Sequence, residues 1–314
     1  LAISVIFVGA LIAASTGIVG ATVIAMGLIS LPIMLSRNYD PSLAAGTICA
    51  TGTLGQIIPP SIALVILGDV LSAAYQQSQL SIGNFSARTV SVGDLFMGAI
   101  VPGLMLVFCY ALYVIIRAYL SPKMAPVQEA TIVSGRWKIL FSSLLPPFAL
   151  ISSVLGSILL GIATPTEAAG VGALGAILLA VSKSSLNRKN LTEAVETTAE
   201  ITAMVFMILL GSSIFSLVFR GFGGDDLITG IFTELPGGAF GAVLVVMIII
   251  FLLGFILDFI QITLVVVPIV GPALLMLGVD PIWLGIMIAI NLQTSFLTPP
   301  FGFALFYLRG VAPD

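Results

Sequence analysis

The sequence predicts an all-α polytopic membrane protein, and three observations lead to this fold class. First, 59% of the 314 residues are hydrophobic and only 8% are charged, whereas a soluble domain carries about 25% charged residues. Second, several apolar runs reach the roughly 20 residues that a helix needs to cross about 30 Å of hydrocarbon. Third, a chain of this length cannot bury so much apolar surface inside a water-soluble fold.

The composition also excludes several kinds of chemistry. Histidine is absent, which rules out Ser-His and Cys-His catalysis, histidine haem ligation and imidazole metal sites. The two cysteines, Cys49 and Cys109, lie in apolar stretches, so we expect small buried residues rather than a disulfide or a zinc site. A net charge of −3 gives no reason to expect a nucleic-acid partner.

Four apolar runs are predicted to cross the membrane as simple helices. The first covers residues 96–120, and the other three cover 139–162, 166–181 and 201–219. Residues 191–200 carry three glutamates among apolar side chains, and this pattern indicates an amphipathic helix at the membrane surface.

Two further apolar regions are too short on each side of a polar centre to be pairs of full spans. Residues 1–36 carry no charged side chain and have Ser15-Thr16-Gly17 near the middle. Residues 239–279 carry a single charge, Asp258, near the centre. Since arms of roughly 14 to 18 residues extend only about 21 to 27 Å, we expect two re-entrant hairpins that enter and leave on one face.

Each predicted hairpin is followed by an Asp-Pro pair and then by an apolar segment with a Pro-Pro interruption. The pairs are Asp40-Pro41 with Pro59-Pro60, and Asp280-Pro281 with Pro299-Pro300. Two successive prolines remove backbone donors and break a helix, which predicts broken helices at 40–74 and 281–308. Pro41 and Pro281 are each followed 18 positions later by the Pro-Pro pair, and this equal spacing indicates an internal repeat.

Lysine and arginine in short loops predict the orientation, because such loops tend to stay in the cytoplasm. Basic residues cluster in and beside a linker at 121–138 and again at 183–189, so both loops are placed in the cytoplasm. The polar stretch at 75–94 is then an external loop. The first hairpin consequently opens from the cytoplasm and the second opens from the outside.

The predicted organisation is therefore two inverted repeats, 1–120 and 139–314, joined by the cytoplasmic linker 121–138. Inverted repeats with broken helices are typical of ion-coupled secondary transporters. The first repeat has no span before its hairpin and the second has none after its broken helix, so we expect further spans at both ends of a longer protein.

A sodium ion needs oxygen ligands, which unwound helix ends, hydroxyls and amides can provide. The first hairpin tip and the first break supply one candidate set for sodium or substrate: Ser15, Thr16, Gly17, Thr51, Gly52, Thr53, Gln56, Pro59 and Ser61. The alternative is that these small residues only allow helices to pack closely, as is common in membranes.

The second tip and break supply the other candidate set: Gly254, Asp258, Asn291, Gln293, Thr298 and Pro299. An intramembrane carboxylate is costly and usually functional, although an aspartate inside a hairpin is also a preferred helix N-cap. Both roles can coexist at one tip. Thr164 and Glu167 stand on either side of Pro165 in a capping-box pattern, which favours a structural role for that pair.

Several motifs together resemble the large permease subunit of the tripartite ATP-independent periplasmic (TRAP) transporters. They are Ser15-Thr16-Gly17 with Ala21-Thr22, the glycine-rich run into Pro59-Pro60-Ser61, Gly161 to Ala169, Leu257-Asp258 with Pro268, and Asn291-x-Gln293 leading to Thr298-Pro299-Pro300-Phe301-Gly302. The first tip departs from the Ser-Gly-Ser of many members, and the 75–94 loop is longer than in compact members.

The resemblance implies an elevator-type member of the ion transporter superfamily in a bacterial or archaeal cytoplasmic (inner) membrane. It implies sodium-driven symport of an organic acid, with Na⁺ as coupling ion and no other cofactor. Its implied partners are a small membrane subunit and a periplasmic substrate-binding protein. Substrate would lie between the two tips, with one sodium site at each tip and its facing break.

Two other functions remain open at this point. One is a stand-alone sodium/anion symporter of the same superfamily that uses no binding protein. The other is an intramembrane aspartyl enzyme, which needs two carboxylates at membrane depth. Only Asp258 lies clearly there, since Asp69 falls nearer an interface, so we do not expect an enzyme.

Overall fold

The computed structural model describes residues 1–85, 89–126, 136–299 and 302–312, and these residues form helices and connecting turns without a strand. Six of the helices in this part of the chain are long and apolar enough to cross a membrane. The number is seven if α9 (Gly224–Glu234) and α10 (Gly238–Leu253), which meet at a bend of 119°, are counted as one span. The fold is therefore that of an all-α, multi-pass membrane protein.

The chain begins with a helical hairpin made of α1 (Ala2–Thr16) and α2 (Val19–Ser36). Gly17 ends α1 in the left-handed conformation, with φ of 63°, which glycine adopts without the steric cost of a side chain. Its backbone N–H donates to Ala13 O at 2.9 Å. The hairpin therefore turns within two residues.

The first broken helix follows directly. It consists of α3 (Pro41–Thr53), the 3₁₀ turn η1 (Leu54–Gln56) and α4 (Ile62–Ser81). Asp40 caps the start of α3 by accepting hydrogen bonds from the backbone N–H groups of Ser42 and Leu43. Because Pro59 and Pro60 cannot donate backbone hydrogen bonds, the helix stops at η1 and restarts at Ser61, the N-cap of α4.

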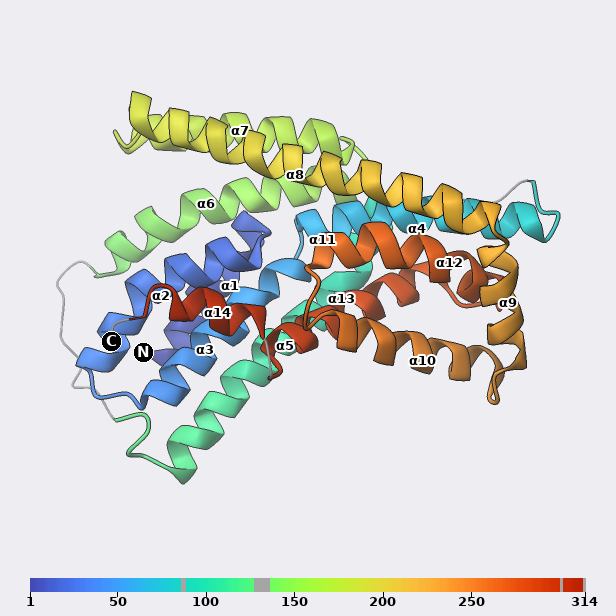
Figure 1. Cartoon of the computed structure of the whole chain (residues 1–314). Coiled ribbons are helices and arrows are strands. Elements are labelled where there is room, and N and C mark those ends of the chain that lie inside the picture. The colour runs from blue at the N-terminus through green and yellow to red at the C-terminus, as the bar shows by residue number, and fades with distance from the viewer. Residues whose placement is uncertain (86–88, 127–135, 300–301, 313–314) are drawn as a thin grey trace.

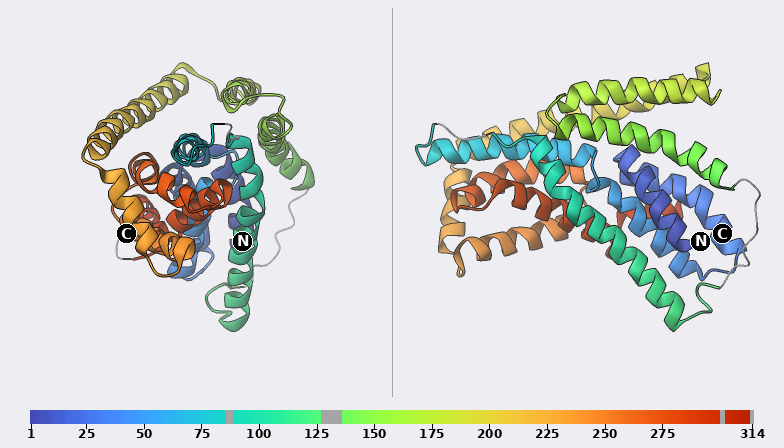
Figure 2. Two further views of the ribbon diagram at one scale, coloured as in Figure 1. Left: turned by 90° about the vertical axis from the view of Figure 1, so that its right-hand side faces the viewer. Right: turned by 180° about the vertical axis from the view of Figure 1, so that it is seen from behind.

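Four long helices come next: α5 (Val92–Leu120), α6 (Arg136–Leu159), α7 (Pro165–Ser182) and α8 (Arg188–Gly221). Figures 1 and 2 show α6, α7 and α8 along one side of the molecule, outside the packed centre. Among their described side chains only a few are buried, such as Ala168 and Ser212. Their apolar surfaces are therefore left to lipid or to another protein.

The second hairpin differs in detail from the first. After α10 the chain turns through residues 254–258 and continues as α11 (Phe259–Gln261), the π-helical segment η2 (Ile262–Val266) and α12 (Val267–Met276). A second broken helix, α13 (Pro281–Leu297) and α14 (Phe303–Arg309), completes the described chain. Asp280 caps α13 by accepting from Trp283 N at 2.8 Å.

The two hairpins and the two broken helices form the packed centre. The first halves stay with their own hairpins, since α3 packs on α1 and α2 and α13 packs on α10. The second halves cross over, since α4 packs on α12 and α14 packs on α2. Each broken helix therefore packs against both hairpins, with one half on each. The first break, η1, also packs against α13 of the second broken helix.

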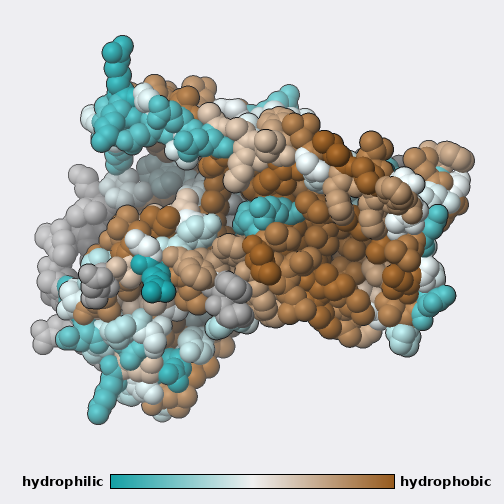
Figure 3. All heavy atoms as spheres, viewed as in Figure 1, coloured by the Kyte–Doolittle hydropathy of each residue, from teal (hydrophilic) through white to brown (hydrophobic). Residues whose placement is uncertain are grey.

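The surface agrees with a position inside a membrane. In Figure 3 hydrophobic residues cover most of the visible face over α10, α12 and the last part of α8, apart from one hydrophilic patch near the middle, and further hydrophilic residues gather toward the two ends. Large exposed apolar side chains on this surface include Phe215, Leu244 and Ile248. Such contiguous apolar surface is not tolerated in water.

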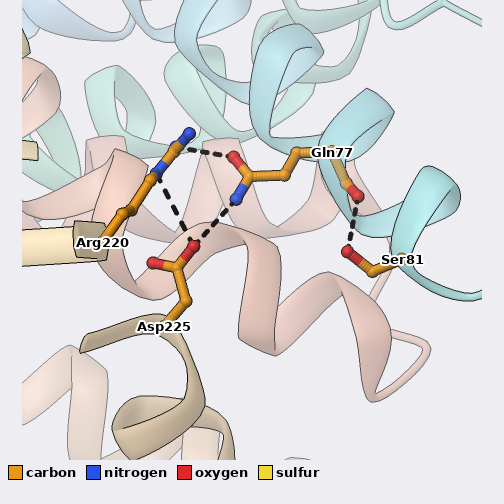
Figure 4. A network of polar contacts seen from close by, with 4 residues as sticks. All are labelled: Gln77, Ser81, Arg220 and Asp225. Carbon is orange, nitrogen blue, oxygen red and sulfur yellow. Dashed lines mark hydrogen bonds and ion pairs between the residues drawn. The ribbon is translucent and has the colours of Figure 1, made fainter. Parts of the chain in front are cut away.

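Some predicted boundaries were wrong. The stretch at 75–94 was expected to be a loop, but α4 continues through Ser81. Tertiary contacts explain the extra turns, because Gln77 donates to Asp225 Oδ2 at 3.2 Å and accepts from Arg220 Nη2 at 2.7 Å (Figure 4). These contacts join α4 to the end of α8 and the start of α9, so the polar residues stay helical.

One further boundary differs. The predicted surface helix at 191–200 and the predicted span at 201–219 form one continuous helix, α8, because no proline or glycine separates them. Between α8 and α10 the chain forms the additional helix α9. In the predicted linker 121–138, residues 127–135 lie outside the described part of the chain.

Candidate functional site

The first hairpin tip is in close contact with the first break. A Cβ atom added to Gly55 in η1 would lie 3.0 Å from Ala13 O of α1, and one added to Gly17 would lie 3.2 Å from Ile62 N of α4. Thr16 and Thr22 join the two arms of the hairpin through a hydroxyl pair at 2.6 Å. The tip therefore meets the break through its backbone.

Within the first break, most of the predicted polar groups are used locally. Thr51 and Thr53 donate to backbone carbonyls of their own helix. Ser61 Oγ donates to Gln56 O at 2.9 Å and accepts from Leu64 N at 3.4 Å. The side chain of Gln56 is an exception, since it is 3% exposed and its Oε1 has no hydrogen-bond partner among the described residues.

The second tip also faces its break, but through side chains. A Cβ atom added to Gly254 would collide with the side chain of Ser295 on α13. Asp258 is the N-cap of α11 and forms a capping box with Gln261, whose Oε1 accepts from Asp258 N at 3.1 Å. In the π-helical segment that follows, Thr263 is fully buried and its Oγ1 has no partner within the described chain.

The C-terminal part of α13, just before the second break, contains another buried amide with a free oxygen. Gln293 is 2% exposed; its Nε2 donates to the Tyr110 hydroxyl at 3.0 Å, while its Oε1 has no partner in the described structure. Asn291 instead donates to Met247 O at 2.7 Å, which holds α13 against α10. Thr298 donates to Thr294 O at 2.8 Å, Pro299 is exposed, and Pro300 lies outside the described residues.

The two candidate sets meet at the centre of the molecule. Tyr110 of α5 is in polar contact with Thr53 as well as with Gln293, and η1 packs against α13. The free amide oxygens of Gln56 and Gln293 therefore belong to neighbouring elements. A buried polar atom without a partner is rare and calls for an explanation. Both amide oxygens are uncharged acceptors, a ligand type that hard cations use in proteins.

Other predicted residues lie apart from this centre. Ser15 is exposed and its hydroxyl donates to Ile12 O within α1. Gly52 packs against Val23. Thr164 and Glu167 form a reciprocal capping box at the start of α7, with Thr164 N donating to Glu167 Oε2 at 2.8 Å and Glu167 N donating to Thr164 Oγ1 at 3.3 Å.

The sequence analysis missed three residues that shape the centre: Gly55, Tyr110 and Thr263. Gly55 falls inside the glycine-rich run that was noted before the first Pro-Pro pair, so its position was a usable signal. Tyr110 lies in an ordinary apolar span, and Thr263 lies in a hairpin arm with no distinguishing pattern. Only the packing of distant elements shows that these two residues matter.

Several helices long and apolar enough to cross a membrane, together with helices that break near the packed centre, are typical of membrane transport proteins. The comparison of sequences gives the particular family. The chain matches the family described as tripartite ATP-independent periplasmic transporter, DctM component, over residues 1–313. The chain belongs to this family, as the motifs had indicated.

Curated relatives agree with this assignment. The chain is 31% identical to the C4-dicarboxylate TRAP transporter large permease protein DctM of Vibrio cholerae, over 99% of this chain and 69% of that protein. It is likewise 31% identical to DctM of Pseudomonas aeruginosa, over 99% of this chain and 68% of that protein. The ectoine TRAP transporter large permease protein TeaC of Halomonas elongata is 30% identical, over 94% of this chain and 65% of TeaC.

Proposed function

We propose that the protein is the large permease subunit of a sodium-coupled secondary transporter that imports an organic acid across the inner membrane. The observation that carries the proposal is the pair of buried amide oxygens, Gln56 Oε1 and Gln293 Oε1, which have no hydrogen-bond partner among the described residues and lie on adjoining elements at the two helix breaks. Leaving buried acceptors unsatisfied costs free energy, and a bound cation would offset that cost.

The chemistry of these groups fits sodium. A hard cation prefers oxygen ligands, and broken helices in transporters supply backbone carbonyls for Na⁺. The hydroxyl of Thr263, which also has no partner in the described chain, could add a third oxygen to the two amides. Asp258 would then contribute negative charge from the second tip while it continues to cap α11, because capping uses only part of its acceptor capacity.

The substrate class follows from relatives and from the helix ends. The names of two relatives give a C4-dicarboxylate as the substrate, and a third gives ectoine; the two C4-dicarboxylate carriers are the more similar. Helices α4 and α14 both begin at a break, and a helix N-terminus favours an anionic group. We therefore place a carboxylate-bearing substrate between the two tips.

Movement of the packed centre against the outer helices would carry the substrate. The crossing of α4 and α14 between the two hairpins is the arrangement that two inverted repeats would give, and α6, α7 and α8 make few contacts with the centre. An elevator-type carrier needs such a separable unit. The exposed apolar faces of α6 to α8 provide a surface for the small membrane subunit, and the periplasmic binding protein would deliver the substrate.

The test uses the full-length protein with its small subunit in proteoliposomes, with the binding protein and radiolabelled succinate outside. Uptake is expected only with an inward sodium gradient and with the binding protein present. Gln56→Leu and Gln293→Leu are each expected to raise the half-saturating sodium concentration by roughly tenfold or more, since each removes one buried ligand oxygen.

Two control variants distinguish the loss of a ligand oxygen from a general effect of substituting a nearby residue. Gln76→Leu changes an exposed glutamine on α4 and is expected to leave sodium dependence unchanged. Tyr110→Phe removes the hydroxyl that accepts a hydrogen bond from Gln293 Nε2 but keeps both amide oxygens. It is therefore expected to raise the half-saturating sodium concentration less than Gln293→Leu does. Uptake that persists without sodium would overturn the coupling, and uptake without the binding protein would favour a stand-alone symporter.

A further inference from the structure

We propose that Arg117 binds a carboxylate of the transported organic acid in a second site, in a cavity at the loop end of α5. The inference rests on the proposed function, because it takes an organic acid as the substrate. The cavity has a volume of about 560 Å³ and lies between α3, α5 and the residues on either side of the second break. Small-molecule sites commonly have volumes of about 300 to 1,000 Å³.

The cavity leads away from the centre described above. Tyr110, which binds Gln293, lies at one end, and Arg117 and Met124 lie at the other. Arg117 follows Tyr110 by seven positions in α5, which corresponds to about 10 Å along the helix. In Figure 1, α5 runs diagonally out of the packed centre toward the end of the molecule where α3 begins. A substrate that leaves the centre along α5 would therefore meet Arg117.

Arg117 has donor capacity that the protein does not use. It is the sole charged residue among those that line the cavity in the described structure. Its Nε is buried and has no hydrogen-bond partner among the residues described, and its Nη2 contacts Met124 Sδ at 3.0 Å, a weak acceptor. A buried cationic donor without an acceptor is costly, which favours an acceptor supplied by a ligand.

The nearest acidic group is already engaged. Asp40 lies close enough for the charge of Arg117 to contribute to the lowering of the Asp40 pKa, but the hydrogen bond from the Ser42 hydroxyl is the largest cause. The Asp40 carboxylate also caps α3 through Ser42 N and Leu43 N. No ion pair joins it to Arg117 within the described part of the chain. The guanidinium therefore keeps a face for another anion.

A guanidinium group is well matched to this ligand, because its planar array of N–H donors can bind both oxygens of a carboxylate. The cavity also has open space near the Arg117 guanidinium. A Cβ atom added to Gly46 of α3 would have no heavy atom within 4 Å, although Gly46 lines the cavity. Apolar side chains such as Leu43, Val114 and Leu297 surround the remaining space, as expected for the carbon chain of an organic acid.

A phospholipid phosphate has the same chemistry and could reach the same arginine at a membrane surface. The proposal commits to the carboxylate, because the cavity extends inward to Tyr110 rather than along the outer surface of α5. The experiment separates the two sources by using two lipid compositions.

The probe is succinate, added to the complete carrier in nanodiscs of neutral phosphatidylcholine, with the melting temperature as the readout. Succinate is expected to raise the melting temperature of the wild type. Arg117→Gln is expected to raise the half-saturating succinate concentration by roughly tenfold. Lys123→Gln removes a charge from an exposed position in the turn that follows α5 and is expected to leave that concentration unchanged.

A second variant guards against a folding defect in Arg117→Gln. Gly46→Leu fills the cavity from an open position, so the melting temperature without succinate is expected to stay at the wild-type value while the succinate response is lost. A wild type without a succinate response, or variants that respond like the wild type, would overturn the inference. So would an Arg117 effect that appears only as lost stabilisation by phosphatidylglycerol.

The proposed function can fail separately. If succinate binding depends on Arg117 but uptake into proteoliposomes is independent of sodium, the sodium coupling is wrong and the Arg117 site stands. If uptake is driven by sodium and Arg117→Gln binds succinate normally, only the Arg117 site is wrong.

Discussion

The two hairpin tips meet their breaks in different ways. In the first, α1 and α2 are joined by two residues, and the contact with the break is between backbones, with Gly55 beside Ala13 O. In the second, residues 254–258 separate α10 from α11, and the contact is between Gly254 and the side chain of Ser295. The first contact is fixed by chain geometry, whereas the second depends on one side chain.

The polar side chains of the two tips also differ, because only the second tip carries a charge. The first tip is neutral and holds itself together through the hydroxyls of Thr16 and Thr22. The second tip carries the carboxylate of Asp258 and continues into a π-helical segment, a distortion frequently found at functional sites. We infer that the first unit is the more rigid of the two and that the second unit responds more strongly to the coupling ion.

The largest expected effects come from filling the two close approaches. Gly55→Ala and Gly254→Ala each insert a methyl group into occupied space and are expected to lower the free energy of unfolding by about 1 to 3 kcal/mol. Adding Ser295→Gly is expected to restore most of the loss in Gly254→Ala, because it removes the colliding side chain. No side-chain truncation is expected to rescue Gly55→Ala, since its obstacle is a backbone oxygen.

Thermal unfolding of the purified carrier measures these effects. Gly156→Ala in α6 is the matched control, because a Cβ atom there would have nothing within 4 Å, and it is expected to be neutral or slightly stabilising. If Gly55→Ala unfolded at the same temperature as Gly156→Ala, the backbone contact between the first tip and its break would be refuted.

The local signals in the sequence were sufficient for much of the fold. Gly17, the Asp-Pro pairs and the Pro-Pro pairs act through the conformation of their own backbone, so the hairpins and breaks could be placed without knowledge of the tertiary structure. The end of α4 could not be placed, because Gln77 keeps its helix through contacts with Arg220 and Asp225, about 140 positions away.

The candidate site shows the same limit. Gln56 and Gln293 were identified because amides near a helix break can supply oxygen ligands, and the structure leaves their Oε1 atoms without partners in the described chain. Asn291 matched the same pattern, yet it binds Met247 O. Sequence alone cannot distinguish these cases, because the difference depends on which atoms of α10 and α5 lie opposite each amide.

An intermediate effect is expected at the second tip. Asp258→Asn retains an N-cap residue of similar quality, so expression and melting temperature are expected to stay close to those of the wild type. Loss of the negative charge is expected to raise the half-saturating sodium concentration of uptake by roughly tenfold or more. The first tip offers a comparison, since Thr16→Val removes a neutral hydroxyl and is expected to change that concentration less.

Sodium titrations of succinate uptake in proteoliposomes provide the measurement. A wild-type sodium response in Asp258→Asn would reduce Asp258 to a helix cap. A larger change in Thr16→Val than in Asp258→Asn would reverse the comparison and assign the ion-sensitive role to the first tip.

The smallest expected effect concerns the caps at the start of the two broken helices. Asp40 accepts a hydrogen bond from the Ser42 hydroxyl and two from backbone N–H groups, and these lower the Asp40 pKa, with the Ser42 hydroxyl as the largest cause. A carboxyl group with a lowered pKa in the folded state stabilises the protein at pH values above its unfolded pKa, about 3.9, and this contribution is lost as the pH falls through the folded value.

Asp40→Ala is therefore expected to lower the melting temperature slightly at neutral pH, and the difference from wild type should shrink as the pH falls below about 3.9. Ser42→Ala should weaken the same pH dependence, because it removes the largest cause of the shift. Asp280→Ala tests the equivalent cap of the second unit, where the carboxylate accepts from Trp283 N. If the Asp40→Ala difference stayed constant through this acidic range, the Asp40 carboxylate would not contribute to stability through its charge.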